Sequence, residues 1–78
     1  MPRLPKDCDY RRLASFLKKY DYQFIRQKGS HIRLYSDRYS HYLTIPAHNP
    51  IKIGTLNNIL SDIANRTGVS KEELINNL

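Results

Sequence analysis

The stretch HIRLYS, residues 31–36, alternates between apolar and other side chains. Successive side chains of a β-strand point to opposite faces of a sheet. The pattern therefore predicts a half-buried strand in which Ile32 and Leu34 face the core. The solvent-facing side of this strand then carries three side chains of different chemistry: His31, Arg33 and Tyr35. An imidazole, a guanidinium and a phenol in one exposed row make this strand the candidate functional surface.

Two further stretches rich in aromatic and β-branched residues precede and follow it in the sequence. They are Tyr22–Gln27 (YQFIRQ) and His41–Ile45 (HYLTI). That composition is typical of strands. The intervening KGS, Lys28–Ser30, predicts a tight turn because its glycine tolerates the required backbone angles. The sequence does not decide which residues of the first strand face the core, because Phe24 and Ile25 are adjacent apolar residues and only one of them can do so. Three neighbouring strands joined by short turns predict an antiparallel sheet.

Apolar residues recur at i, i+3, i+4 and i+7 in two other segments, which is the pattern of amphipathic helices. The first predicts a helix over about Tyr10–Tyr20 with Asp9 as its N-cap. In the second, Thr55 is a candidate N-cap and Gly68 a candidate stop. SKEEL, residues 70–74, reads as a capping box that opens a short third helix. The periodic positions are Leu13, Phe16, Leu17 and Tyr20 in the first helix, and Leu56, Ile59, Leu60 and Ile63 in the second.

The order of these elements predicts an α+β fold of the form α-β-β-β-α. Two amphipathic helices need a shared apolar surface, and a three-stranded antiparallel sheet offers one such face. We therefore expect both helices on one face, a short C-terminal helix, and an opposite face open to water. With 78 residues the chain is expected to form one domain, residues 1–78. Residues 1–8, with Pro2 and Pro5, are expected to form an irregular lead-in, and Cys8 to be partly exposed and without a role.

The charge is unevenly distributed along the chain. The net charge is +6, and residues 1–38 carry ten Lys or Arg and four Asp or Glu, whereas residues 39–78 carry three of each. A basic half predicts one positive face, as a polyanionic partner requires. The alternative is that these residues only keep the protein in solution.

The single cysteine excludes an internal disulfide and fits a reducing cytoplasm. No apolar run approaches the roughly 20 residues that span a bilayer, and the N-terminal residues lack the apolar core of a signal peptide. We therefore expect a cytoplasmic protein without a membrane partner.

Nucleic acid is one polyanion that this surface could bind, although composition alone does not distinguish RNA from DNA. Arg26, Lys28 and Arg33 lie near the first hairpin and could neutralise phosphates. Tyr35, together with Tyr39 and Tyr42, could stack on unpaired bases. The same residues could equally form a solvated cationic sheet in which tyrosines serve as ordinary strand formers.

His31 adds possible chemistry to this surface. RNA carries its own nucleophile, the 2′-hydroxyl, so strand scission needs a base, an acid for the leaving 5′-oxygen, and cations. A free imidazole titrates near pH ~6.5 and can take either role. A zinc site is improbable with one cysteine and no pair of histidines at ligand spacing. Ser30 beside His31 is not a hydrolase motif, because adjacent strand residues point to opposite faces. His48, in IPAHNP, is either a second functional group or a loop histidine that bonds local backbone.

Three motifs in register resemble one known family. RQKGSH (residues 26–31), LTIPAH (43–48) and GTLNNIL (54–60) occur in the order and spacing of the HicA toxins, the small partners in HicA–HicB type II toxin–antitoxin systems. The resemblance implies a double-stranded-RNA-binding-domain-like fold and an mRNA interferase that cuts RNA without a metal cofactor. The catalytic histidine of the GSH motif corresponds to His31. The resemblance also implies a HicB-type antitoxin that covers this face. Asp21 departs from the family, which often has glycine there.

The leading hypothesis is therefore an endoribonuclease toxin that acts on mRNA with His31 as catalytic residue and with no metal or small-molecule cofactor. The expected RNA-binding residues are Arg26, Lys28, Gly29, Ser30, Arg33 and Tyr35. The alternatives are a non-catalytic RNA-binding module and a protein-interaction domain that docks an acidic partner.

Overall fold

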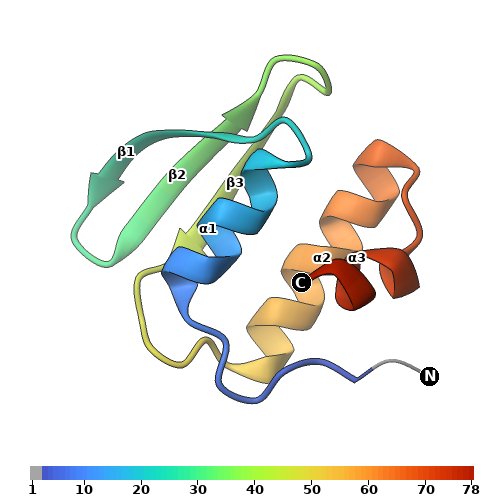
Figure 1. The fold of residues 1–78 in the computed structure, drawn as a ribbon. Helices are drawn as coiled ribbons and strands as arrows, with labels where there is room; N and C mark the ends of the chain where they lie inside the picture. Colours follow the sequence, from blue (N-terminus) through green and yellow to red (C-terminus); the bar gives the residue numbers. More distant parts are fainter. Residues whose placement is uncertain (1–2) are drawn as a thin grey trace.

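The computed structural model describes residues 3–78 and contains the predicted order of elements. The three strands form an antiparallel sheet in the order β1-β2-β3, and the helices gather on one side of it (Figure 1). The prediction of an α+β fold with helices on one face is thus confirmed. The elements are α1 (Tyr10–Lys18), β1 (Gln23–Lys28), β2 (His31–Ser36), β3 (His41–Pro46), α2 (Ile53–Thr67) and α3 (Lys71–Asn77).

Burial along β2 and β3 follows a period of two. Ile32 and Leu34 of β2 and Leu43 and Ile45 of β3 are buried against the helices, while the residues between them are exposed or half-buried. The inner face of the sheet closes over the periodic positions of both helices, as predicted. The buried helical residues are Leu13, Phe16 and Leu17 of α1, Leu56, Ile59, Leu60 and Ile63 of α2, and Leu74 of α3.

The first helix begins as predicted and ends two residues earlier. Its N-cap is Asp9, whose carboxylate accepts a hydrogen bond from the Arg11 amide at 2.7 Å. The chain leaves the helix through Asp21, which has a left-handed φ of 70°. The Tyr22 amide then donates to the Leu17 carbonyl at 3.1 Å, which directs the chain into β1. Aspartate tolerates this conformation at modest cost, so the turn forms here without a glycine.

The second helix starts earlier than the sequence predicts. Its N-cap is Lys52, which makes no side-chain capping bond, so the prediction of Thr55 as N-cap is wrong. Its end is as predicted, because Gly68 takes a left-handed φ of 80° and donates its amide to the Ala64 carbonyl. The third helix is capped by Ser70, whose hydroxyl accepts from the Glu73 amide at 3.1 Å.

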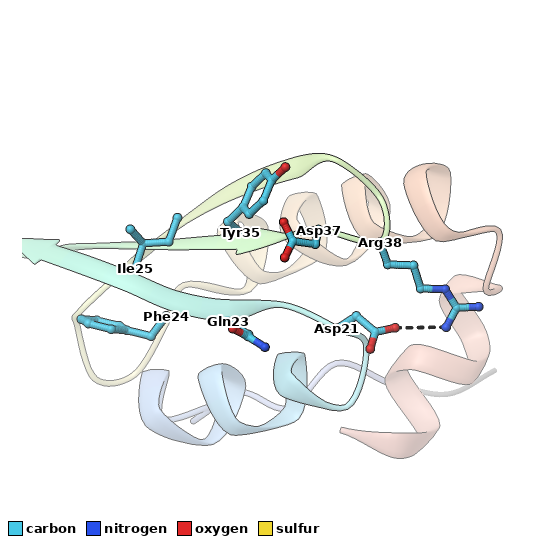
Figure 2. Close-up of a pocket in the computed structure, with 7 residues that line it drawn as sticks. All are labelled: Asp21, Gln23, Phe24, Ile25, Tyr35, Asp37 and Arg38. Atoms are coloured by element: carbon cyan, nitrogen blue, oxygen red, sulfur yellow. Dashed lines mark hydrogen bonds and ion pairs between the residues drawn. The ribbon is translucent and has the colours of Figure 1, made fainter.

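A β-bulge in β1 resolves the competition between Phe24 and Ile25. Phe24 lies opposite Leu34, whereas the next paired residue is Arg26, so Ile25 is the extra residue of the bulge. Figure 2 shows Ile25 on the same side of the sheet as Tyr35 and Phe24 on the side of the helices. Neither is buried, because all six residues of this edge strand are exposed.

The expectation that Cys8 is partly exposed is wrong. Cys8 is fully buried in the core, and its carbonyl accepts a hydrogen bond from the Ile51 amide at 2.9 Å. Burial raises the pKa of its thiol. Residues 3–9 form no helix or strand, as expected of a lead-in, but this contact holds their last part against the loop before α2. Pro2 lies outside the described residues.

Candidate functional site

The side of the sheet away from the helices, here called the outer face, consists of cross-strand rows. His31 lies opposite Lys28 on one side and Pro46 on the other. The next row places Arg33 between Arg26 and Thr44. The row after that places Tyr35 between Gln23 and Tyr42. The alternation of β2 thus brings His31, Arg33 and Tyr35 to one face, and the hairpins add matching residues from β1 and β3.

A depression of about 200 Å³ on this face collects most of the predicted site. We call it the basic depression. It is lined by Arg26, Lys28, His31, Arg33 and Thr44. Arginine and lysine carry permanent positive charge near neutral pH, and the lining contains no carboxylate. The basic depression therefore offers an anion three cations and one imidazole, which is exposed to solvent.

The central arginine is held in place by two neighbours on β3. Its Nη1 donates to the Thr44 hydroxyl at 2.9 Å, and its guanidinium lies 4.6 Å from the centre of the Tyr42 ring. Tyr42 in turn contacts Tyr35, with ring centroids 4.5 Å apart. A guanidinium held by a hydrogen bond and a cation–π contact loses less side-chain entropy when it binds a ligand. Arg33 is therefore preorganised beside an aromatic pair in which Tyr42 is exposed and Tyr35 is half-buried.

Two arginine side chains on this face repel each other and lower the stability of the protein when no partner is bound. Arg26 and Arg33 are directly opposite each other on adjacent strands, where like charges are destabilising. The acidic residues at the ends of these strands do not compensate them, because Asp21 pairs with Arg38 at 3.1 Å at the far end of β1 (Figure 2). An uncompensated cluster of this kind is suited to an anionic partner.

The remaining predicted site residues lie beside the basic depression rather than in it. Gly29 and Ser30 form the two-residue turn of the β1–β2 hairpin, where Gly29 has a left-handed φ of 59°. The Ser30 carbonyl accepts a hydrogen bond from the Ala47 amide at 2.7 Å. Tyr35 lines a different hollow of about 270 Å³ at the bulge end of β1 (Figure 2). The ring of Tyr39 stacks on that of Tyr22, with ring centroids 6.5 Å apart. Tyr39 therefore does not join the aromatic pair on the outer face.

A polar cluster that the sequence did not predict lies on the opposite face of the sheet. His41 is only 9% exposed; its Nδ1 lies 2.7 Å from the Tyr22 hydroxyl and its Nε2 lies 3.2 Å from the Asp62 carboxylate. Burial, and secondarily the Asp62 charge, raise the pKa of Tyr22 to about 12. A protonated phenol can donate to Nδ1, and in the tautomer that accepts this bond Nε2–H donates to Asp62. The alternation of HYLTI contained the signal, since His41 has the same phase as Leu43 and Ile45.

Within residues 3–78, no three His, Cys, Asp or Glu side chains gather closely enough to hold a metal ion. In the same part of the chain, no helix combines the length and apolar character needed to traverse a bilayer.

The fold and the outer face define the class of protein. The α-β-β-β-α order with helices on one face of the sheet is that of double-stranded-RNA-binding-domain-like proteins, here with a basic and aromatic outer face. A comparison with protein families then finds the HicA toxin family, described as HicA toxin of bacterial toxin-antitoxin, over residues 10–64. The match covers most of the chain, from α1 into α2, and the protein belongs to the HicA toxin family. Comparisons with curated proteins and with solved structures gave no match.

Membership of this family makes the protein a toxin of a toxin–antitoxin system, and it implies an antitoxin as its partner.

Proposed function

We propose that the protein is a metal-independent endoribonuclease, an mRNA interferase, and that His31 is its catalytic residue. The observation that carries the proposal is the position of His31 in the basic depression with Arg26, Lys28 and Arg33. The imidazole can transfer a proton, and the cations can stabilise the negative charge of a phosphorane. Both requirements of RNA scission therefore meet in one place on the outer face.

The proposed reaction uses the nucleophile that RNA supplies. The 2′-hydroxyl loses its proton, its oxygen bonds to the adjacent phosphorus, and the bond from phosphorus to the 5′-oxygen breaks as that oxygen gains a proton. The products are a 2′,3′-cyclic phosphate and a free 5′-hydroxyl, with no change of oxidation state. His31 serves one of the two proton transfers. Arg33 is held by Thr44 and Tyr42 so that its remaining donors can face the non-bridging oxygens.

The proposed RNA-binding residues divide by chemistry. Arg26, Lys28 and Arg33 neutralise phosphates without reading sequence. Tyr35, with its contact partner Tyr42, gives unpaired bases an aromatic surface. Gly29 and Ser30 act through the turn that they form, which sets Lys28 directly opposite His31.

The antitoxin is proposed to be of the HicB type and to cover the outer face. A protein bound over the basic depression would exclude RNA from His31 and neutralise the facing Arg26 and Arg33. We expect acidic side chains on its contact surface, because the basic depression is lined with cations.

The decisive experiment measures cleavage of a synthetic RNA by wild type, His31→Ala and the control Lys18→Ala, all in the presence of EDTA. Lys18 is an exposed cation on α1, on the helix side of the sheet. Cleavage should survive EDTA and the control substitution but fall by roughly 10²–10⁴-fold in His31→Ala, the range for loss of an acid–base group. Cleavage by His31→Ala at the wild-type rate would reject the assignment, and complete loss in EDTA would reject the metal-independent mechanism.

The non-catalytic RNA-binding module gives a different result in the same assay. It predicts salt-sensitive RNA binding with no cleavage by any variant, and no growth penalty when the protein is expressed. The protein-interaction alternative predicts no RNA affinity even at low salt.

A further inference from the structure

The ladder between β2 and β3 continues one residue beyond β3. Pro46 lies opposite His31, and the Ala47 amide donates to the Ser30 carbonyl at 2.7 Å. Because this neighbouring pair is hydrogen-bonded, His31 and Pro46 form a non-hydrogen-bonded pair, the type in which facing side chains are closest. Proline fits that position, since no amide hydrogen is needed there. His48 follows Pro46 by two residues, just beyond the end of β3.

His48 and Pro46 line the same depression. Ala47 packs against the core, whereas Pro46 and His48 line one depression of about 250 Å³. The His48 side chain is exposed, whereas Ala47 is half-buried. The remaining residues of this second depression are Pro50, Ile51, Lys52 and Thr55. The cross-strand pair of His31 and Pro46 therefore links the basic depression, which His31 lines, to the second depression, which Pro46 lines with His48.

We propose that His48 is the second acid–base group of this site and works with His31 on opposite sides of the scissile phosphate. The inference rests on the endoribonuclease function proposed above. Scission requires one group that accepts the 2′-hydroxyl proton and another that donates to the departing 5′-oxygen. The sequence has three histidines, and His41 is buried on the inner face with both ring nitrogens engaged. His48 is the imidazole placed to complete the pair.

The pair accounts for both protons of the reaction. One imidazole, neutral at the start, takes the 2′-hydroxyl proton as oxygen bonds to phosphorus. The other, protonated at the start, gives its proton to the 5′-oxygen as the bond from phosphorus to that oxygen breaks. Lys52 lines the second depression and supplies a cation for the RNA strand on that side.

The first test compares kcat and KM for His31→Ala, His48→Ala, His48→Gln and the control Lys18→Ala on one synthetic RNA whose cleaved bond has been mapped with wild type. Both His48 variants should lose roughly 10²–10⁴-fold in kcat, with RNA affinity within about twofold of wild type, since an exposed imidazole carries little of the phosphate binding. Wild type should show a bell-shaped pH profile, and each histidine variant should lose one limb of it.

The second test separates proton transfer from positioning. In an RNA whose 5′-bridging oxygen at the mapped bond is replaced by sulfur, the leaving group departs without protonation. On this substrate one of the two variants, His48→Ala or His31→Ala, should cleave at close to the wild-type rate, and the other should stay impaired. The histidine missing from the rescued variant is then the general acid. Rescue of neither variant would overturn the division of roles.

The outcomes distinguish this inference from the function on which it rests. Full activity of His48→Ala alongside an inactive His31→Ala would remove His48 and leave the ribonuclease proposal intact. A loss in His48→Ala confined to KM would reduce His48 to a binding residue and overturn the proposal. Absence of cleavage by wild type would refute both.

Discussion

Arg26 of β1 and Arg33 of β2 face each other directly across the hairpin, on the same side of the sheet. Two guanidinium groups at this position oppose folding, because like charges on facing strand positions are destabilising. Arg33 has compensating contacts within this face, namely the Thr44 hydroxyl and the Tyr42 ring. The pair is therefore better explained by what it binds than by what it contributes to stability.

Arg26→Ala should weaken RNA binding while leaving the protein as stable as wild type, or more stable by up to about 0.5 kcal/mol, since it removes the repulsion. Thermal melting and RNA titrations at several salt concentrations would measure both effects. The slope of log affinity against log salt should fall by about one unit. A clear loss of stability with unchanged affinity would contradict this account.

Lys28→Ala and Arg33→Ala should also weaken RNA binding more than they destabilise the fold. Arg33→Ala has the larger stability cost of the two, because it leaves the Thr44 hydroxyl and the Tyr42 ring without their partner. Lys18→Ala, which removes an exposed cation on the helix side, provides the matched control. Equal RNA affinity of all three variants would count against a basic RNA-binding face.

Tyr42→Ala should weaken binding of single-stranded RNA by about 1–3 kcal/mol for each base it stacks. Phe24→Ala is the matched control, because both rings are 53% exposed but lie on opposite faces of the sheet. Fluorescence anisotropy with a labelled oligoribonucleotide gives the comparison. Equal effects of the two substitutions would show that the aromatic surface is not specific to the outer face.

Tyr22 should make stability depend on pH in the alkaline range. Its pKa is raised to about 12 in the folded protein, against 10.0 for an ordinary tyrosine. Between these values the unfolded chain loses the phenolic proton and the folded protein keeps it, so the unfolded state is favoured as pH rises. The free energy of unfolding should fall between pH 10 and about 12, and less steeply in Tyr22→Phe.

Tyr22→Phe should also cost about 1–3 kcal/mol near neutral pH, because it leaves the buried Nδ1 of His41 without its partner. Tyr39→Phe, which removes a hydroxyl from the ring that packs on Tyr22, is the control. Denaturant unfolding at neutral and alkaline pH measures both quantities. A Tyr22→Phe variant with wild-type stability and wild-type pH dependence would exclude this coupling.

Asp21 allows a test of backbone strain. Asp21→Gly and Asp21→Ala both lose the ion pair with Arg38, so their difference in stability isolates the left-handed φ of 70°. Asp21→Gly should be the more stable of the two by about 1 kcal/mol. Equal melting curves for the two variants would indicate that the turn relaxes to another conformation.

Local patterns identified the elements that depend on short-range rules. The alternation of HIRLYS gave the limits and facing of β2, and the helical periodicity gave the buried residues of α1 and α2. Asp9, Gly68 and Ser70 were predicted as caps because capping is a contact within one or two turns.

Three features were predicted wrongly or left open: the burial of Cys8, the facing of β1 and the start of α2. The burial of Cys8 comes from packing of the lead-in against Ile51, and the bulge at Ile25 depends on pairing with a second strand. The start of α2 lies before Thr55, where no local capping signal marks it.

The sequence by itself determined which residues of β2 face water, because strand alternation is a property of the backbone, and its motifs indicated the HicA family. Only the tertiary structure decided which residues from β1 and β3 stand beside His31, because strand register is set by pairing across the whole sheet. It also decided that His41 is buried in contact with Tyr22 and with Asp62 at the edge of the core, since those three residues meet only when α2 packs on the sheet.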